Sequence, residues 1–476
     1  MKRACNWLFI ALAIVLSASA VSAQSGSSVT SSAPAAASNS FQSSVPGKFE
    51  SGVLNISLRD AIARGMKQNL GLLLAGEDLR TSRGERLKQL SALLPNANTT
   101  TFVNESQTNL AEFGFNFKVP GGPAIPSIVG PFKYYDARAS VTQSLFDWKA
   151  INNSKAASEN VKSAEYTYKD ARDLVILAVG YTYLQAIADE ARVETAQAQV
   201  KTAQALYDQA NDQLKAGTSP SIDALRAQVE LKTRQQQLIQ AKNDFAIQKL
   251  TFARVIGLAP GQEFELTDKS LYAPLESISL EDALKRAYSS RSDYQAALAS
   301  VRAAEYSRKA AHGEYYPTLS FNGDYGVAAD LPTTIAHGVF DVRGTLTIPI
   351  FQGGRVRGNV LEADAQLRQA RERAANLQAQ IDADVRTALL NLQSSQDQVA
   401  VAQSNIDLAE QTLAQSRDRF AAGVTNTVEV VQAEEQVAAA HEQYISSLYS
   451  FNYSKISLAR ALGLAEQGVN EYFKGK

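Results

Sequence analysis

The chain carries one sequence pattern twice, and this duplication limits its possible folds more than any other feature. The segment ISLRDA at 56–61 recurs as ISLEDA at 278–283, so the offset is 222 (278 minus 56). Other matches follow in the same order at offsets of 205 (341 minus 136) and 206 (423 minus 217). Solenoid repeats have periods of about 20–50 residues, so this period is too long for them. The sequence therefore predicts two copies of one structural unit, at 53–277 and 278–476.

Each unit reads as helix, strand, strand, very long helix, turn and return helix. Apolar residues of the second long helix recur at alternating spacings of three and four, the pattern of a coiled-coil seam. No proline interrupts 148–216 or 350–422, and a helix of this length spans about 100 Å. An ordinary antiparallel coiled-coil hairpin is the alternative interpretation. The expected elements are strands at about 96–107 and 134–147, a long helix at about 148–216 and a return helix at about 221–256, then strands at about 317–328 and 338–351, a long helix at about 354–422, a return helix at about 427–462 and a short tail.

Three of the predicted strands alternate between apolar and polar residues, and the strand before Asn104 is patterned only weakly. Phe340 and Val342, for example, alternate with Asp341 and Arg343. Segments of about ten residues with this pattern are typical of membrane barrels, which face lipid outward and water inward. A soluble, half-buried sheet produces the same alternation and is the alternative.

One chain supplies four such strands, which is too few for a membrane barrel. A closed barrel needs about eight or more strands, because an open edge cannot be left in lipid. The sequence therefore predicts an oligomer that shares one barrel, and counting alone allows two, three or four copies.

The first residues have the pattern of a secretory signal peptide, expected at 1–23. Lys2 and Arg3 precede a short apolar run, and small residues precede the expected cleavage site. A Ser- and Ala-rich stretch follows, and we expect a flexible leader over 24–52. The only cysteine, Cys5, lies in the signal, so the mature chain has no thiol. No later apolar run approaches the length of a membrane-spanning helix, which leaves strands as the way to cross a membrane.

Two pairs of motifs resemble the TolC-like outer-membrane efflux proteins. The first pair lies where a strand meets a long helix and comprises Phe146, Asp147 and Trp148 in the first unit and Phe351, Gly353, Gly354 and Arg355 in the second. The second pair resembles the family's hairpin tips, where the long helix reverses, and comprises Leu214, Gly217, Leu225, Gly423, Val430 and Val431 as candidate tip and adaptor-contact residues. The resemblance covers nearly everything from Leu54 to about Gly463.

This resemblance implies a mainly α fold with a membrane β-barrel contribution. Three chains would form a homotrimer, in which a twelve-stranded β-barrel continues into a twelve-helix coiled-coil α-barrel. It also implies a cell outer membrane location in a Gram-negative-type bacterium, with the helical tunnel in the periplasm and the barrel among outer-membrane lipids.

The implied function is a passive exit duct for drugs, small molecules or proteins in a tripartite efflux or type I secretion system. The implied partners are a periplasmic adaptor protein and an inner-membrane transporter of the RND, ABC or MFS type. The alternatives are a periplasmic coiled-coil adaptor and a structural protein without a pore. Duplication and the lack of Gly-rich β domains argue against an adaptor.

The resemblance places a gate at the periplasmic tips. Asp223 and Glu429 lie six positions after the tip glycines, where the family has gate acids that would form rings about the three-fold axis. The alternative makes both simple helix-start acids, favoured by the helix dipole. Phe420 and Gln432 are the other two gate candidates. Together with Thr425 they stand where the family's best-studied lock has tyrosine, an acid and arginine, so that lock does not transfer to this chain.

No pattern in the sequence indicates an enzyme. The three histidines, His312, His337 and His441, lie in unrelated segments, and no metal-ligand spacing, nucleophile elbow or phosphate loop is present. The sequence predicts no cofactor and no metal. A formal net charge of −1 is unlike the basic domains that bind nucleic acid, so we expect no nucleic-acid partner.

Overall fold

The computed structural model describes residues 40–114, 126–268, 278–329 and 337–466. The predicted signal peptide, 1–23, lies outside the described residues. Residues from Phe41 onward belong to one compact unit. Its elements, in chain order, are β1 (Leu54–Ile56), α3 (Leu58–Gln68), α4 (Leu70–Ser91), β2 (Asn96–Asn109), the 3-10 helix η1 (Leu110–Phe113), β3 (Ile128–Phe146), α5 (Trp148–Lys215), α6 (Ser221–Ile256), β4 (Phe264–Leu266), α7 (Leu280–Ser290), α8 (Ser292–Gly313), β5 (Thr318–Ala329), β6 (His337–Thr347), α9 (Arg355–Ala421) and α10 (Thr427–Ala461).

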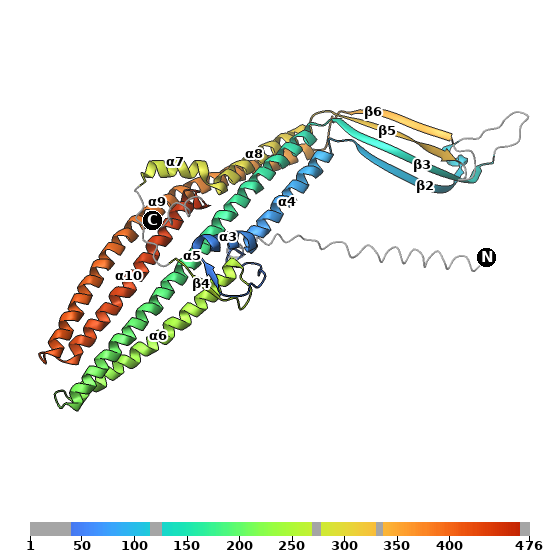
Figure 1. The fold of residues 1–476 in the computed structure, drawn as a ribbon. Coiled ribbons are helices and arrows are strands. Elements are labelled where there is room, and N and C mark those ends of the chain that lie inside the picture. The colour runs from blue at the N-terminus through green and yellow to red at the C-terminus, as the bar shows by residue number, and fades with distance from the viewer. Residues whose placement is uncertain (1–39, 115–125, 269–277, 330–336, 467–476) are drawn as a thin grey trace, which may run out of the picture. The chain divides into compact units, whose positions relative to one another are not determined.

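Helices dominate this unit, and the two longest, α5 and α9, follow strands β3 and β6 with only a short connection between them (Figure 1). Each long helix reverses at its far end into a return helix, α6 or α10. Helix contacts run in the order α6, α5, α10, α9 on the hairpin side and α4, α5, α8, α9 nearer the strands. Helices α6 and α4 therefore form one flank, and α9 forms the other.

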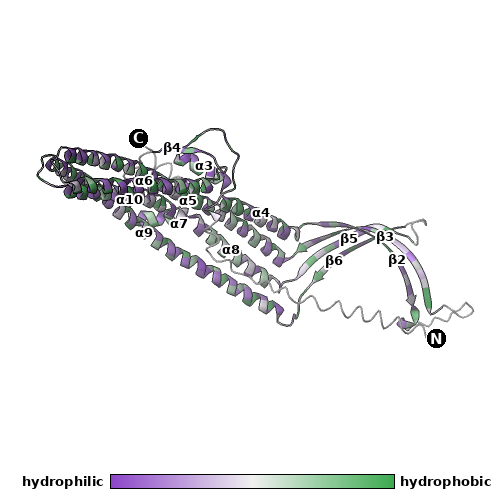
Figure 2. Cartoon of the chain, turned by 90° about the horizontal axis from the view of Figure 1, so that it is seen from below, coloured by the Kyte–Doolittle hydropathy of each residue, from purple (hydrophilic) through white to green (hydrophobic). Residues whose placement is uncertain are grey.

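The seam predicted along the second long helix is buried. Ile381, Val385 and Val399 are at most 4% exposed, and alanines lie between them at the seam spacing. Hydrophilic and hydrophobic residues alternate along α9 (Figure 2), because the opposite face of the helix meets water. Burial of one stripe stabilises a helix that its sequence alone would leave marginal.

The two repeats contribute equivalent core residues. Ile176 and Ile381, both fully buried, are related by an offset of 205 (381 minus 176), and Ile256 and Leu462 by an offset of 206 (462 minus 256). The first pair of positions lies on the long helices and the second at the ends of the return helices. Each set packs into its own hydrophobic cluster.

Strands β2, β3, β5 and β6 form one antiparallel sheet in that order. The two repeats meet in its centre, where β3 of the first pairs with β5 of the second. Strands β2 and β6 are therefore the two edges of the sheet. A second, two-stranded parallel sheet, β1 with β4, belongs to the helical part.

Two expectations need correction. The predicted flexible leader, 24–52, is packed in its last part: Phe41 packs against the first hydrophobic cluster, and Gly47 donates a backbone hydrogen bond to Gly257. Backbone pairing of this kind orders a segment that is poor in apolar residues.

The second correction concerns membrane-spanning helices. One stretch of α5 is long and apolar enough to cross a membrane by length and composition, but half of it is buried in the protein. Val175 and Val179 of this helix lie in the core.

Candidate functional site: the sheet face, the junctions and the helical tips

The register places polar residues of all four strands on one face of the sheet. One row across the sheet reads Asn98, Ser140, Asp324 and Asp341, and Arg138 lies in the next row. The opposite face carries exposed apolar side chains, namely Val103, Val141, Tyr325, Val327, Phe340, Val342 and Leu346. A sheet with water on one side and lipid on the other needs this division.

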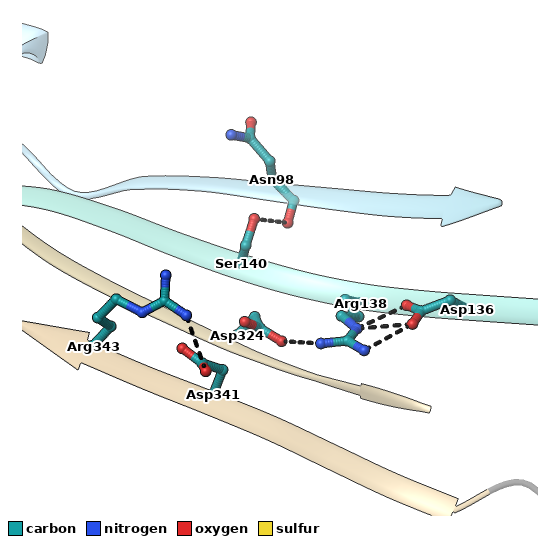
Figure 3. Close-up of polar contacts among 7 residues, drawn as sticks. All are labelled: Asn98, Asp136, Arg138, Ser140, Asp324, Asp341 and Arg343. Atoms are coloured by element: carbon teal, nitrogen blue, oxygen red, sulfur yellow. Dashed lines mark hydrogen bonds and ion pairs between the residues drawn. The ribbon is translucent and has the colours of Figure 1, made fainter. Parts of the chain in front are cut away.

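Charged side chains on the polar face form two separate sets of contacts (Figure 3). The Arg138 guanidinium donates to Asp136 at 2.8 Å and, across a strand boundary, to Asp324 at 2.9 Å. Arg343 donates to Asp341 at 3.5 Å. The repeated Asp-x-Arg motif therefore forms an ion pair in both repeats, but only the first copy gains a second carboxylate.

The first strand–helix junction is built from predicted residues. Asp147 caps α5 and accepts a hydrogen bond from the Ala150 amide at 2.9 Å. Trp148 packs edge-to-face on Tyr316, with ring centroids 6.3 Å apart. Phe146 is exposed and ends β3. The cap satisfies an amide that would otherwise lack a partner at the helix start.

At the second strand–helix junction, two glycines form the turn that leads into α9. Gly353 and Gly354 have φ of +57° and +85°, a region that favours glycine. Phe351 is 88% exposed in one chain, and Arg355 begins α9 and pairs with Glu314 at 2.8 Å.

Sequence reasoning missed the residue that joins these junctions. The Glu314 carboxylate accepts from Lys149 of the first repeat at 2.7 Å and from Asn359 of the second at 3.0 Å, besides Arg355. Burial raises the pKa of Glu314, but the bonds from Lys149 and Asn359 outweigh it and hold the pKa below its ordinary value. An acid directly before the Tyr-Tyr-Pro entry to a strand was the available signal.

Both predicted tips reverse on a glycine in the left-handed region. Gly217 and Gly423 each have φ of +71°. Gly217 donates to the Leu214 carbonyl and Gly423 to the Phe420 carbonyl, both at 3.0 Å. These are helix C-terminal bonds that require this backbone conformation.

The two tip acids lie in the first turns of their helices. Asp223 is only 7% exposed and accepts from the Ser219 hydroxyl at 3.1 Å. Glu429 accepts from Thr425 at 2.5 Å and lies 3.5 Å from Arg419. Asp223 therefore is not the exposed first-turn acid that its position suggests.

The other predicted tip residues fall into two groups, one exposed to solvent and one buried between the hairpin helices. Leu225 and Gln432 are exposed, and Leu214 is half-buried. Phe420 and Val430 are buried in a cluster shared by all four hairpin helices, and Val431 packs against it. The Val430 and Phe420 side chains therefore pack against neighbouring helices, and their roles in adaptor contact and in the gate stay predictions.

A charged layer lies beyond this apolar cluster. Arg234 of α6 binds Glu230 at 2.5 Å with both side chains under a tenth exposed, and Arg417 of α9 binds Glu434 of α10 at 3.1 Å. Burial raises the pKa of Glu434. Among the described residues, no group of three or more His, Cys, Asp or Glu is placed to hold a metal ion.

Known proteins share this architecture. The fold is similar to that of the Campylobacter jejuni CmeC outer membrane channel, with a TM-score of 0.74 and 18% identity over 88% of this chain and 89% of that chain. It is also similar to a crystal structure of CusC, with a TM-score of 0.73 and 18% identity over 88% of this chain and 99% of that chain.

Sequence relatives point the same way. The chain is 23% identical to the toluene efflux pump outer membrane protein TtgF of Pseudomonas putida over 425 residues, 85% of this chain and 83% of TtgF. It is 25% identical to the cation efflux system protein CusC of Escherichia coli over 326 residues, 66% of this chain and 69% of CusC.

The outer membrane efflux protein family model matches residues 82–258 and 283–464, which lie in the first and second repeat. This match favours an efflux channel over a periplasmic adaptor or a structural protein without a pore. The chain belongs to the outer membrane efflux protein family, and it is an outer-membrane channel protein of an efflux system.

Proposed function

We propose that three copies of this chain form one conduit, with a shared barrel in the outer membrane and a helical tunnel in the periplasm. The sheet carries this proposal, because it has one polar face, one apolar face and two open edges, β2 and β6. Lipid does not tolerate open edges, so β6 of one copy pairs with β2 of the next. Three copies is the number that the family resemblance implies.

Exposed apolar residues on the helical flanks support the same assembly. They lie on α6 (Ile222, Val229, Ile239, Ile247, Leu250) and α9 (Leu361, Leu390, Val401, Leu408). Helix α10, which lies between α5 and α9 and is described along its whole length, has no large hydrophobic residue among those exposed. Exposed apolar side chains that gather on one flank often mark an interface, and in the proposed trimer α6 of one copy packs on α9 of its neighbour.

Disulfide crosslinking tests this contact directly. Helix α6 begins at Ser221 and α9 ends at Ala421, so Ile239 and Val401 lie at similar distances from the tips. The chain's only cysteine, Cys5, lies in the predicted signal peptide, so Ile239→Cys with Val401→Cys should give a covalent ladder that ends at the trimer. Either cysteine alone is the control. A ladder that ends at a dimer, or a stable monomer by native mass spectrometry, would contradict the trimer.

The proposed assembly also indicates how solutes are transported and which proteins the conduit works with. The conduit passes solutes without using energy, and an inner-membrane transporter of the RND, ABC or MFS type drives them. A periplasmic adaptor binds the tips, where Leu225 and Val424 present exposed apolar side chains. The names of its relatives suggest small organic molecules or cations as cargo.

The tips close the conduit at rest, and Glu429 is the more exposed of the two candidate gate acids. Repeated three times, the tip acids attract cations to the narrowest point. Asp223→Asn with Glu429→Gln should therefore reduce cation selectivity and block by divalent cations added from the periplasmic side. We expect Glu429→Gln alone to give most of the change, because Asp223 is buried.

Reversal potentials across a salt gradient in planar bilayers measure this effect. Glu77→Gln is the control, because it removes one exposed acid on α4, away from the tips. Unchanged selectivity in the double variant would make both acids helix-start residues only.

A further inference from the structure

The polar face of the sheet carries five charged residues midway along its strands: Asp136, Arg138, Asp324, Asp341 and Arg343. At the other register-paired positions of this face the described strands have neutral side chains and His337. The five residues sum to −1 per chain, three carboxylates against two guanidiniums. We call this set the charge band.

The two arginines of the band are held very differently. Arg138 is bound by two carboxylates and is 38% exposed, whereas Arg343 touches one carboxylate at 3.5 Å and is 69% exposed. The lack of a side chain at Gly326 explains how Arg138 reaches its second carboxylate. A Cβ at Gly326 would lie 2.7 Å from the Cγ of Arg138, so the missing side chain lets Arg138 lie over strand β5 and reach Asp324.

The duplication indicates what Arg343 meets in the assembled barrel. Strand β3 maps onto β6 at an offset of 205 and β5 onto β2 at an offset of 222. The counterpart of Asp324 is therefore Phe102 (324 minus 222), which would lie on the neighbouring copy beside Arg343. Phe102 already packs edge-to-face on Tyr134 at 5.8 Å. The second carboxylate that ties down Arg138 is thus replaced by an aromatic ring.

The acids are arranged unevenly as well. Asp324 and Asp341 face each other directly across β5 and β6, a juxtaposition of like charges that destabilises a sheet unless it is compensated. Arg138 compensates Asp324 from one side. Asp341 is left half-exposed with a weakly held partner.

From this geometry we infer that the charge band is a selectivity element of the pore, separate from the tips, and that it favours cations over anions. The inference rests on the proposed trimeric barrel, in which the band lines the water-filled interior three times over. A net negative wall raises the local concentration of cations. Because charge is screened over about 8 Å at physiological salt, small ions respond only near the wall, but a large solute that fills the lumen meets the band fully.

Two single substitutions should shift selectivity in opposite directions. Arg343→Gln makes the band more negative, and Asp341→Asn makes it neutral. In about 0.01 M KCl, where screening extends over about 30 Å, we expect the permeability ratio of K⁺ to Cl⁻ to rise about two-fold in Arg343→Gln and to fall about two-fold in Asp341→Asn. Both differences should vanish near 1 M KCl, where the screening length is about 3 Å.

Glu105→Gln is the matched control. Glu105 pairs with Lys133 on the neighbouring strand at 3.3 Å, but the register places this pair on the opposite face of the sheet. The variant removes the same charge as Asp341→Asn without touching the lumen, and its selectivity should equal that of the wild type.

The outcomes separate the inference from the proposed function. Channels whose selectivity is the same in all four proteins, or that shift equally in Glu105→Gln and Asp341→Asn, would overturn the inference and leave the trimeric channel intact. A wild-type protein that forms no channel would overturn both. Opposite shifts confined to the two band variants would establish the charge band.

Discussion

The two hairpin tips have the same backbone and different side-chain environments. Their glycines share a φ of +71° and the same hydrogen-bond pattern. Yet Phe420 of the second tip is buried in the shared apolar cluster, whereas its counterpart Leu214 (420 minus 206) is half-buried outside that cluster. The duplication therefore kept the conditions for the turn, while only the second tip places its residue three before the glycine in the cluster that both hairpins share.

The two return helices, α6 and α10, also differ in the side chains that they bury at equivalent positions. Arg234 of α6 lies buried beside Glu230, and its counterpart in α10 is Ala440 (234 plus 206). A charged residue thus occupies a seam position in the first hairpin that a small apolar residue fills in the second. Buried ion pairs of this kind contribute little net stability, because removing charges from water offsets their attraction. We expect the hairpins to separate at this layer more readily than at the apolar cluster.

The largest expected difference between the tips follows truncation of their counterpart residues. Phe420→Ala should cost about 3–5 kcal/mol, because it empties a buried aromatic site. At the lower figure, amides of the cluster should exchange with solvent about 100-fold faster if the tip opens locally. Leu214→Ala, the matched variant, should change exchange far less. Equal effects measured by hydrogen–deuterium exchange would show that the two tips are packed alike.

A smaller and equal effect is expected at the glycines. Gly217→Val and Gly423→Val force a β-branched residue into left-handed backbone, at a cost of about 1–2 kcal/mol. No neighbouring atom lies within 4 Å of the added Cβ at either site, so backbone strain alone acts. Export should fall in both variants while insertion into the outer membrane is retained, since the sheet lies at the other end of the long helices (Figure 1).

Asparagine, which tolerates this conformation, provides the control. Gly217→Asn and Gly423→Asn should retain most of the export activity, as measured by resistance to a transported compound. Full export by an abundant Gly423→Val protein would remove the tip assignment.

The smallest effect concerns the charged layer and depends on pH. Burial raises the pKa of Glu434 above its ordinary 4.5, so the folded protein binds this proton more tightly than the unfolded chain. Stability must then fall as pH rises from about 4.5 through the raised pKa. Glu434→Gln should remove this decline. Thermal unfolding of both proteins between pH 4 and 8 measures it, and parallel curves would exclude Glu434 as the titrating group.

Much of this architecture could be predicted from local patterns. The seam along α9 depends on a heptad period and the two faces of β6 on strict alternation, and both are visible in any short window. The tip glycines were also predictable, because a helix that ends in a turn favours glycine at one position, and the family resemblance placed Asp147 at a strand–helix junction. The structure places all of these where the sequence indicated.

The contacts between residues far apart in the chain were not predictable in the same way. The flexible leader was expected to reach residue 52, but backbone bonds to distant parts of the chain order its last part, as in Gly47 with Gly257. Asp223 had the position of an exposed helix-start acid, and packing of α6 against its neighbours buried it. Glu314 carried no recognisable motif, although it binds both junctions.

The sequence by itself determined the duplication, the element types, the two faces of each strand and the places where the chain reverses, because each depends on residues close together in the chain. Only the tertiary structure decided which charges meet. Arg138 reaches Asp324, 186 residues away, because β3 pairs with β5 in one register and Gly326 leaves its path open. A shift of one residue in that register would turn every side chain of a strand to the other face, so the charge band exists only through the pairing of the two repeats.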